Sequence, residues 1–227
     1  MLMVCAMGCS QPSKSPADAR DASRDRAAEE LADAAQVVRE MNQIGSAHRE
    51  RARCVAVLPS LVRAGFIVGG RHGDGVVSCR TSSGWSAPAF ITITGGSAGF
   101  QIGVESSDLV MLVMTDRAMA QLFRSNFAVG ADASAAAGPV GEAAQAGTDA
   151  SMKAEILSYA RSRGLFAGAE LSGAVVKQDT DALVAAYGAS ADVHAILAGD
   201  VSAPKEANAF LASLGAEFGS GPVASAK

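Results

Sequence analysis

The segment "GFIVGGRHGDGV" (65–76) combines five glycines with an arginine and a histidine, a composition that suggests a loop for phosphate. A Walker loop needs a lysine and then a serine or threonine after its glycines, and a dinucleotide loop must open a helix. Neither requirement is met, because Val76 begins a strand-like run. The glycines therefore predict a tight hairpin turn between the short strands "GFIVGG" and "GVVSCR". A turn that also contacts a ligand is the alternative.

Ser97 stands in "GGSAG" (95–99), which matches the G-x-S-x-G pattern of a hydrolase nucleophile, with His194 downstream in hydrolase order. That chemistry needs a strand-to-helix turn that exposes the serine, whereas the following "FQIGVES" alternates like a strand. We therefore expect no catalytic residue, and a serine hydrolase using Ser97 is a distant alternative. The three histidines lie in unlike contexts without the spacing of a metal centre, so we expect no metal and no cofactor.

Six arginines stand between residues 49 and 80 against only two acids, in a chain whose net charge is −4. The overall charge argues against a nucleic-acid partner. A local basic face, however, suits anionic phospholipids at a membrane surface. A solvated strand face is the other interpretation of the same charges. The residues that we expect to contact lipid are Arg51, Arg53, Arg63 and Arg71.

Cys9 closes "AMGC" (6–9), which resembles a bacterial lipobox, the motif whose cysteine is lipidated after signal cleavage. The apolar stretch before it is short and lacks the preceding positive charge of a signal peptide. The expected organisation is a lipoprotein signal-like segment at 1–9, a tether at 10–27 and a globular domain at 28–227. Ser10 predicts an outer-membrane lipoprotein of the bacterial cell envelope that faces the periplasm. An ordinary N-terminal segment with a chance cysteine is the alternative.

Cys54 and Cys79 are the two cysteines of the globular part. A periplasmic location would allow a disulfide between them. Each cysteine also stands in an apolar, strand-like run, where an unpaired buried thiol is common. Both outcomes are equally compatible with the sequence.

Periodicity divides the chain into helical ends and a strand-rich middle. Apolar residues at three- and four-residue spacings predict a helix over about 17–43. Residues 116–125 predict a short helix capped by Asp116, and 179–188, 191–199 and 204–219 predict C-terminal helices. Short strands with glycine turns and no helices between them predict an antiparallel sheet. The fold class is therefore α+β: a largely antiparallel, barrel-like sheet with N- and C-terminal helices packed on it.

Four segments carry a resemblance to a known family, in the order "AVLPSLVRAGFIVGGRHGDGVV" (56–77), "GWSAPAFITITGGSAGFQIGVESSDLVMLVMT" (84–115), "FAVGADASAAAGPVG" (127–141) and "YARSRGLFAGAELSGAVV" (159–176). Together they resemble the SYLF domain family over about residues 30–200. The resemblance implies phospholipid binding, phosphoinositide binding in eukaryotic members, actin binding in some of these, and no enzymatic activity. The family's turn usually carries a lysine where this chain has Asp74, which leaves Arg63 and Arg71 to meet a headgroup.

The sequence thus predicts a non-enzymatic, phospholipid-binding lipoprotein of the bacterial envelope that contacts anionic headgroups through a basic face. A structural or protein-interaction lipoprotein, with an unknown protein partner, is the alternative.

Overall fold

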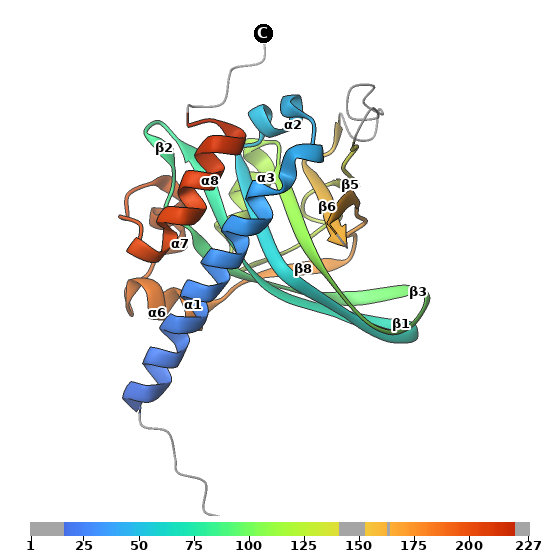
Figure 1. The fold of residues 1–227 in the computed structure, drawn as a ribbon, viewed down its shortest axis with the longest axis horizontal. Helices are drawn as coiled ribbons and strands as arrows, with labels where there is room; N and C mark the ends of the chain where they lie inside the picture. Colours follow the sequence, from blue (N-terminus) through green and yellow to red (C-terminus); the bar gives the residue numbers. More distant parts are fainter. Residues whose placement is uncertain (1–15, 141–152, 163, 221–227) are drawn as a thin grey trace, which may run out of the picture.

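The computed structural model describes residues 16–140, 153–162 and 164–220, which form a curled sheet with helices from both ends of the chain (Figure 1). In these residues eight strands pair in the order β2-β1-β3-β6-β5, with β7 on β6, β8 on β3 and β4 on β8. Each of these pairings is antiparallel except β5 with β6. The expected α+β class and its largely antiparallel, barrel-like sheet are confirmed. The strands are β1 (Cys54–Thr81), β2 (Gly84–Trp85), β3 (Ala89–Val113), β4 (Asn126–Ala128), β5 (Ala135–Ala137), β6 (Ile156–Ser162), β7 (Leu165–Gly168) and β8 (Ala174–Gln178).

Strands β1 and β3 are 28 and 25 residues long and pair antiparallel along most of their length. We call this pair of strands the β1–β3 ribbon. The hairpin turn expected within 65–76 is therefore wrong, because Gly73 pairs with Ile93 inside the ladder. The chain reverses instead at residues 82–83, between β1 and β2. Register shifts at 58–61 and 66–68 interrupt the ladder, and the ribbon sweeps out to a bend that projects away from the helices (Figure 1).

The glycines of β1 let the strand fold back across itself. Gly73 lies against Leu61, and Gly75 lies against Val57 and Leu58, all in the same strand. A Cβ at Gly75 would overlap the carbonyl oxygen of Val57 and lie 2.7 Å from the Cα of Leu58. Sheet layers with side chains between them stack about 10 Å apart, so this closer approach requires glycine. The glycines thus serve a crossing of two strand segments and not a turn.

Gly75→Ala should lower the free energy of unfolding by about 2 kcal/mol, because the added methyl group has no room at the crossing. The matched control is Gly70→Ala in the same strand, whose Cβ would meet only the Gly95 carbonyl oxygen at 3.9 Å. We expect that control to change stability by less than about 0.5 kcal/mol. Urea unfolding followed by circular dichroism measures both variants, and equal stabilities would show that the crossing tolerates a side chain.

The expected N-terminal helix is present as α1 (Pro16–Arg39), followed by the 3₁₀ turn η1 (Met41–Gln43). α1 packs against β1, α6 and α8. Its predicted apolar stripe is buried: Leu31, Ala34, Ala35 and Val38, continued by Met41 and Ile44. Residues 16–27, the second part of the expected tether, belong to the first half of α1. None of the helices in the described ranges is long and apolar enough to cross a bilayer.

The remaining helices are α2 (Ser46–Arg51), α3 (Asp116–Leu122), α6 (Thr180–Tyr187), α7 (Val193–Ala198), the 3₁₀ turn η2 (Lys205–Ala207) and α8 (Asn208–Phe218). The C-terminal helices occur where the sequence predicts them. The expected cap of α3 is shifted by one residue, because the side chain of Thr115, and not that of Asp116, accepts the hydrogen bond from the Ala118 N–H. Threonine can cap because its hydroxyl oxygen satisfies an otherwise unpaired amide of the first turn.

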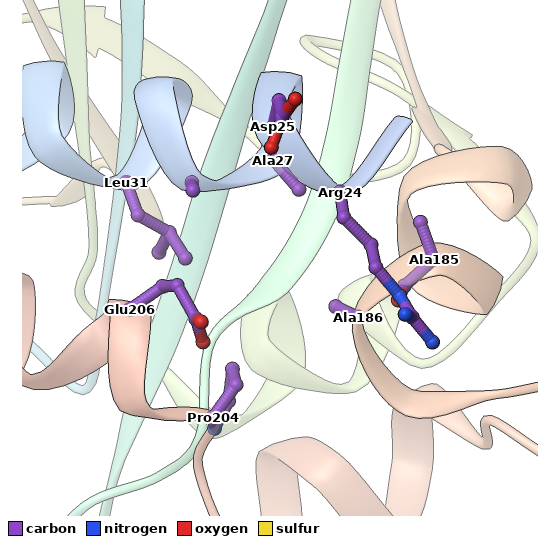
Figure 2. A pocket seen from close by; sticks show the side chains of 9 residues that line it. Arg24, Asp25, Ala27, Leu31, Ala185, Ala186, Pro204 and Glu206 are labelled. Carbon is purple, nitrogen blue, oxygen red and sulfur yellow. The ribbon is translucent and has the colours of Figure 1, made fainter. Parts of the chain in front are cut away.

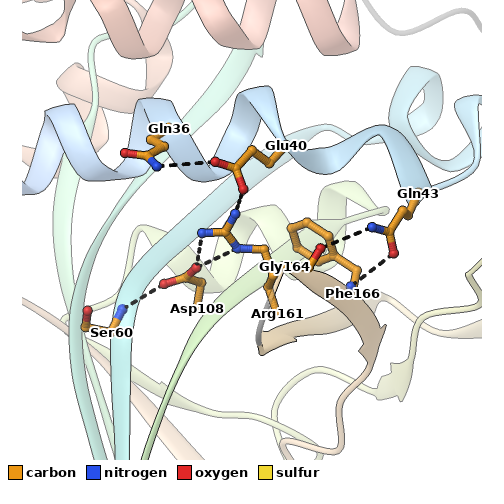
Figure 3. A network of polar contacts seen from close by, with 8 residues as sticks. All are labelled: Gln36, Glu40, Gln43, Ser60, Asp108, Arg161, Gly164 and Phe166. Atoms are coloured by element: carbon orange, nitrogen blue, oxygen red, sulfur yellow. Dashed lines mark hydrogen bonds and ion pairs between the residues drawn. The ribbon is translucent and has the colours of Figure 1, made fainter.

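A polar network joins the end of α1 to the sheet (Figure 3). Arg161 of β6 forms ion pairs with Asp108 of β3 at 2.7 Å and with Glu40, directly after α1. Asp108 also accepts the backbone N–H of Ser60 at 3.2 Å. Ser60 has a φ of 61°, an uncommon angle for a residue with a side chain, so this hydrogen bond helps to hold the bulge in β1. The network therefore holds the C-terminal end of α1 against β1, β3 and β6.

Cys54 and Cys79 form a disulfide, which decides between the two alternatives that the sequence left open. Both cysteines are fully buried, and their Cα atoms are 3.9 Å apart. They stand near the two ends of β1, 25 residues apart in sequence. The bond is possible only because β1 folds back on itself, and it closes the bend into a covalent ring.

Candidate anion-binding site

The four arginines that we expected to contact lipid lie at two separate places. Arg51 ends α2, and Arg53 forms an ion pair with Asp116 at 2.9 Å. Arg63 and Arg71 lie further along β1, on either side of its bend. Ten residues of extended strand separate Arg53 from Arg63, which corresponds to roughly 30 Å. The structure thus does not gather the four residues into one basic face.

Arg63 and Arg71 are brought together by the fold of β1. Side chains alternate along a strand, so both lie on the face that carries Leu61 and Gly73, the residues that meet at the crossing. Arg71 donates from Nη1 to the carbonyl oxygen of Glu170 at 3.2 Å, and from Nη2 to the carbonyl oxygen of Gly96 at 3.0 Å. These bonds fix the guanidinium of Arg71 between β3 and the segment before β8. We call Arg63 and Arg71 the arginine pair.

Each side chain of the arginine pair keeps one buried donor, its Nε, without an acceptor in the described part of the chain. Burial lowers the pKa of Arg71, and the neighbouring charge of Arg63 lowers it further. Both guanidinium groups stay charged, because arginine is not deprotonated in proteins. Among the described residues, the Nε atoms of both side chains are buried without a hydrogen-bond partner. Buried donors nearly always have a partner, so two free donors beside two like charges form a site that an anion would complete.

Two carboxylates border the arginine pair and limit its net charge. Glu105 stands opposite Arg63 in the ladder. Hydrogen bonds from Ser172 lower the pKa of Glu170, which therefore stays ionised beside Arg71. The site thus offers directed donors to an anion but only a weak long-range attraction.

The other two arginines of the predicted basic set, Arg49 and Arg80, serve the end of α8. Arg80 donates to the carbonyl oxygens of Phe218 and Gly219 and lies 4.6 Å from the centre of the Trp85 ring. Arg49 donates to Glu217, both to its carbonyl oxygen at 3.1 Å and to its carboxylate. Cations at a helix C-terminus satisfy its free carbonyls and its dipole. Trp85, five residues after Arg80 in the sequence, was the signal for this cluster. Sequence reasoning missed the cluster.

A pocket of about 360 Å³ between α1 and β1 carries the opposite charge. Its lining includes four carboxyl groups, on Glu29, Glu30, Asp33 and Asp74, together with Arg26 and His72. Burial, and to a smaller extent the charges of Asp74 and Asp179, raise the pKa of Glu30 from 4.5 to about 8. Sequence reasoning missed this cluster, because its members come from a helix and from the far half of β1.

Replacing Glu30 should change how stability depends on pH. The folded state keeps the Glu30 proton up to about pH 8, whereas the unfolded chain loses it near 4.5. Between these values the free energy of unfolding falls as pH rises, by up to roughly 1.4 kcal/mol per pH unit from this group. Glu30→Gln should therefore be more stable than wild type at pH 8 and should lose this slope. Thermal unfolding between pH 5 and 8 measures it, with the exposed Glu29→Gln as control; identical slopes for wild type and Glu30→Gln would refute the assignment.

A second pocket, of about 420 Å³, lies between α1, α6 and η2 (Figure 2). Alanines of α1 and α6 line it together with Leu31 and Pro204. Arg24 reaches across to the carbonyl oxygen of Ala185 at 3.4 Å, and Asp25 and Glu206 also line the pocket (Figure 2). Among the described residues, the lining holds no serine, cysteine or histidine.

The remaining sequence candidates are placed as follows. The backbone of Ser97 is inside β3 and pairs with Gly69, and strand continues on both sides, so the strand-to-helix turn of a hydrolase is not formed there. In the described ranges no three His, Cys, Asp or Glu residues are grouped as metal ligands. Cys9 lies outside the described residues.

The chain is similar to a family model described as "Ysc84: Las17-binding protein actin regulator", which matches residues 94–217. It is 35% identical over 186 residues to "SH3 domain-containing YSC84-like protein 1" of Rattus norvegicus and 34% identical to the Homo sapiens protein of that name; the match covers 77% of this chain and 54% of each relative. It is 33% identical over 166 residues to "Protein YSC84" of Saccharomyces cerevisiae, which covers 71% of this chain and 35% of that protein. The chain thus spans about half the length of the mammalian relatives.

Proposed function

The chain belongs to the Ysc84 family, which is the SYLF domain family. On that premise we propose that it is a non-enzymatic protein that binds anionic phospholipid headgroups at the arginine pair. The observation that carries this proposal is the pair itself. Arg63 and Arg71 converge from the two sides of a bend, and each has a buried Nε without a partner.

A lipid phosphate fits what the arginine pair lacks. Its oxygens would accept from both guanidinium groups, and its charge would relieve the repulsion between them. Both arginines stand within five residues of the 66–68 bend, where the ribbon projects away from the helices (Figure 1). Each cation near an anionic bilayer contributes about 1 kcal/mol, so two give roughly 2 kcal/mol. That is weaker than millimolar binding, so such a site serves a protein that is also held at the membrane in another way.

Arg63→Gln with Arg71→Gln should reduce binding to phosphatidylglycerol vesicles roughly 30-fold, the equivalent of the 2 kcal/mol above. The matched control is Arg51→Gln with Arg53→Gln, which removes the same charge from the separate place and should reduce binding no more than a few-fold. Co-sedimentation at low and high salt measures the partition coefficient of each full-length variant, all carrying Cys9→Ala so that no acyl group contributes. If both double variants lost the same amount of vesicle binding, the binding would depend on total charge alone and the arginine pair would not be the site.

Lipidation of Cys9 would supply the second attachment. Its support is the lipobox-like "AMGC", and the Cys54–Cys79 disulfide suits an oxidising compartment such as the periplasm. We propose on these grounds an outer-membrane lipoprotein of a bacterial envelope whose domain faces the periplasm.

Cys9→Ala should move the full-length protein from the membrane to the soluble fraction, because roughly 2 kcal/mol from the arginine pair does not hold it there alone. Fractionation of expressing bacteria, with mass spectrometry of the N-terminal peptide, measures both the location and the acyl group. A membrane-bound Cys9→Ala protein together with an unmodified wild-type Cys9 would contradict the proposal.

A protein-binding role is the second candidate. The words "Las17-binding" in the family description favour it. The protein-binding role becomes the better candidate if neither the wild-type protein nor any variant binds anionic vesicles.

A further inference from the structure

The β1–β3 ribbon exposes apolar side chains on the face opposite the arginine pair. Val104 has 76% of its surface exposed, the largest value among the large apolar side chains of the described residues, and Val62 has 39%. Ala64 is exposed as well and pairs with Val104 across the ladder. These three residues form an outward patch close to the bend.

The outward patch and the arginine pair belong to the same few residues of ribbon. Arg63 stands between Val62 and Ala64, and successive residues of a strand rise about 3.4 Å and point to opposite faces. A bilayer that meets the bend edge-on borders both faces of the ribbon, so a headgroup held by Arg63 would then lie within roughly 10 Å of Val104. Water-exposed valine gains free energy when it is buried in lipid, so the same contact would favour insertion.

We propose that Val104, with Ala64 beside it, enters the boundary between headgroups and acyl chains when the protein is on the membrane. This inference rests on the proposed phospholipid binding and adds the surface that inserts. The projecting ribbon is then the part of the domain that touches the bilayer, and the helices face away from it (Figure 1).

The nearby carboxylates decide which part of the patch inserts. Val62 lines the acidic pocket, next to Glu29 and Asp33 of α1, and an anionic surface repels that side. Glu105 lies on the arginine face, one residue from Val104. Insertion is therefore shallow, and Val104 contributes more to it than Val62 does.

The experiment uses the full-length chain with Cys9→Ala, so that no acyl anchor contributes. Val104→Trp is compared with Val184→Trp, because Val184 is an exposed valine of α6 with 43% of its surface exposed. Vesicles of phosphatidylglycerol and acyl-brominated phosphatidylcholine quench a tryptophan that enters the bilayer. After subtraction of the Trp85 signal of the parent protein, we expect at least half of the added emission of Val104→Trp to be quenched. The added emission of Val184→Trp should stay unchanged.

A second pair of variants tests the energetic part. Val104→Glu should weaken binding to phosphatidylglycerol vesicles about tenfold, whereas Val184→Glu should leave it within twofold. If the vesicles bind the parent protein through Arg63 and Arg71 but Val104→Trp is not quenched and Val104→Glu binds normally, insertion is refuted and headgroup binding stands. If the parent protein does not bind anionic vesicles at all, both proposals fail.

Discussion

The contact of β1 with itself, where Gly73 and Gly75 lie on Leu61 and Leu58, is the constraint on which the rest of the fold depends. Because the two glycines have no side chain, the two segments of the strand can approach closely enough to cross there. Strand β3 follows the same path, since it is paired with β1 along most of its length. Its far half pairs with β6 and its near half with β8, so both sides of the curled sheet are built on one bent ribbon.

The same bend decides what each arginine does. Residues on the two arms of β1 near the bend face each other, which brings Arg63 and Arg71 together without acceptors for their Nε atoms. The start and the end of β1 meet near α8, which gives Arg49 and Arg80 the free carbonyls of a helix end. One cluster of arginines in the sequence thus divides into two groups in the fold. Arg49 and Arg80 have a structural role, whereas Arg63 and Arg71 are available to a ligand.

The helices and the strand-rich middle followed from the sequence because burial imposes a period that local residues carry themselves. The SYLF resemblance, confirmed by the Ysc84 family match, rests on long segments in a fixed order. The bend did not follow, because glycines are needed in hairpin turns and in crossings alike. Their spacing was the overlooked signal: Gly69, Gly73 and Gly75 share one face of a strand, as a crossing requires. The sequence named Arg63 and Arg71 as lipid contacts, but it could not show that they converge apart from Arg51 and Arg53, since that depends on the bend.

The covalent ring between Cys54 and Cys79 has a mechanical consequence. Tension applied along the backbone passes from residue 54 directly to residue 79 through the two sulfur atoms, and residues 55–78 bear none of it. A chain stretched from its ends can be extended outside the ring, while the loop inside the ring stays closed as long as the disulfide is intact. The looped arm of β1, with both members of the arginine pair, is therefore the portion of the molecule that a pulling force cannot straighten.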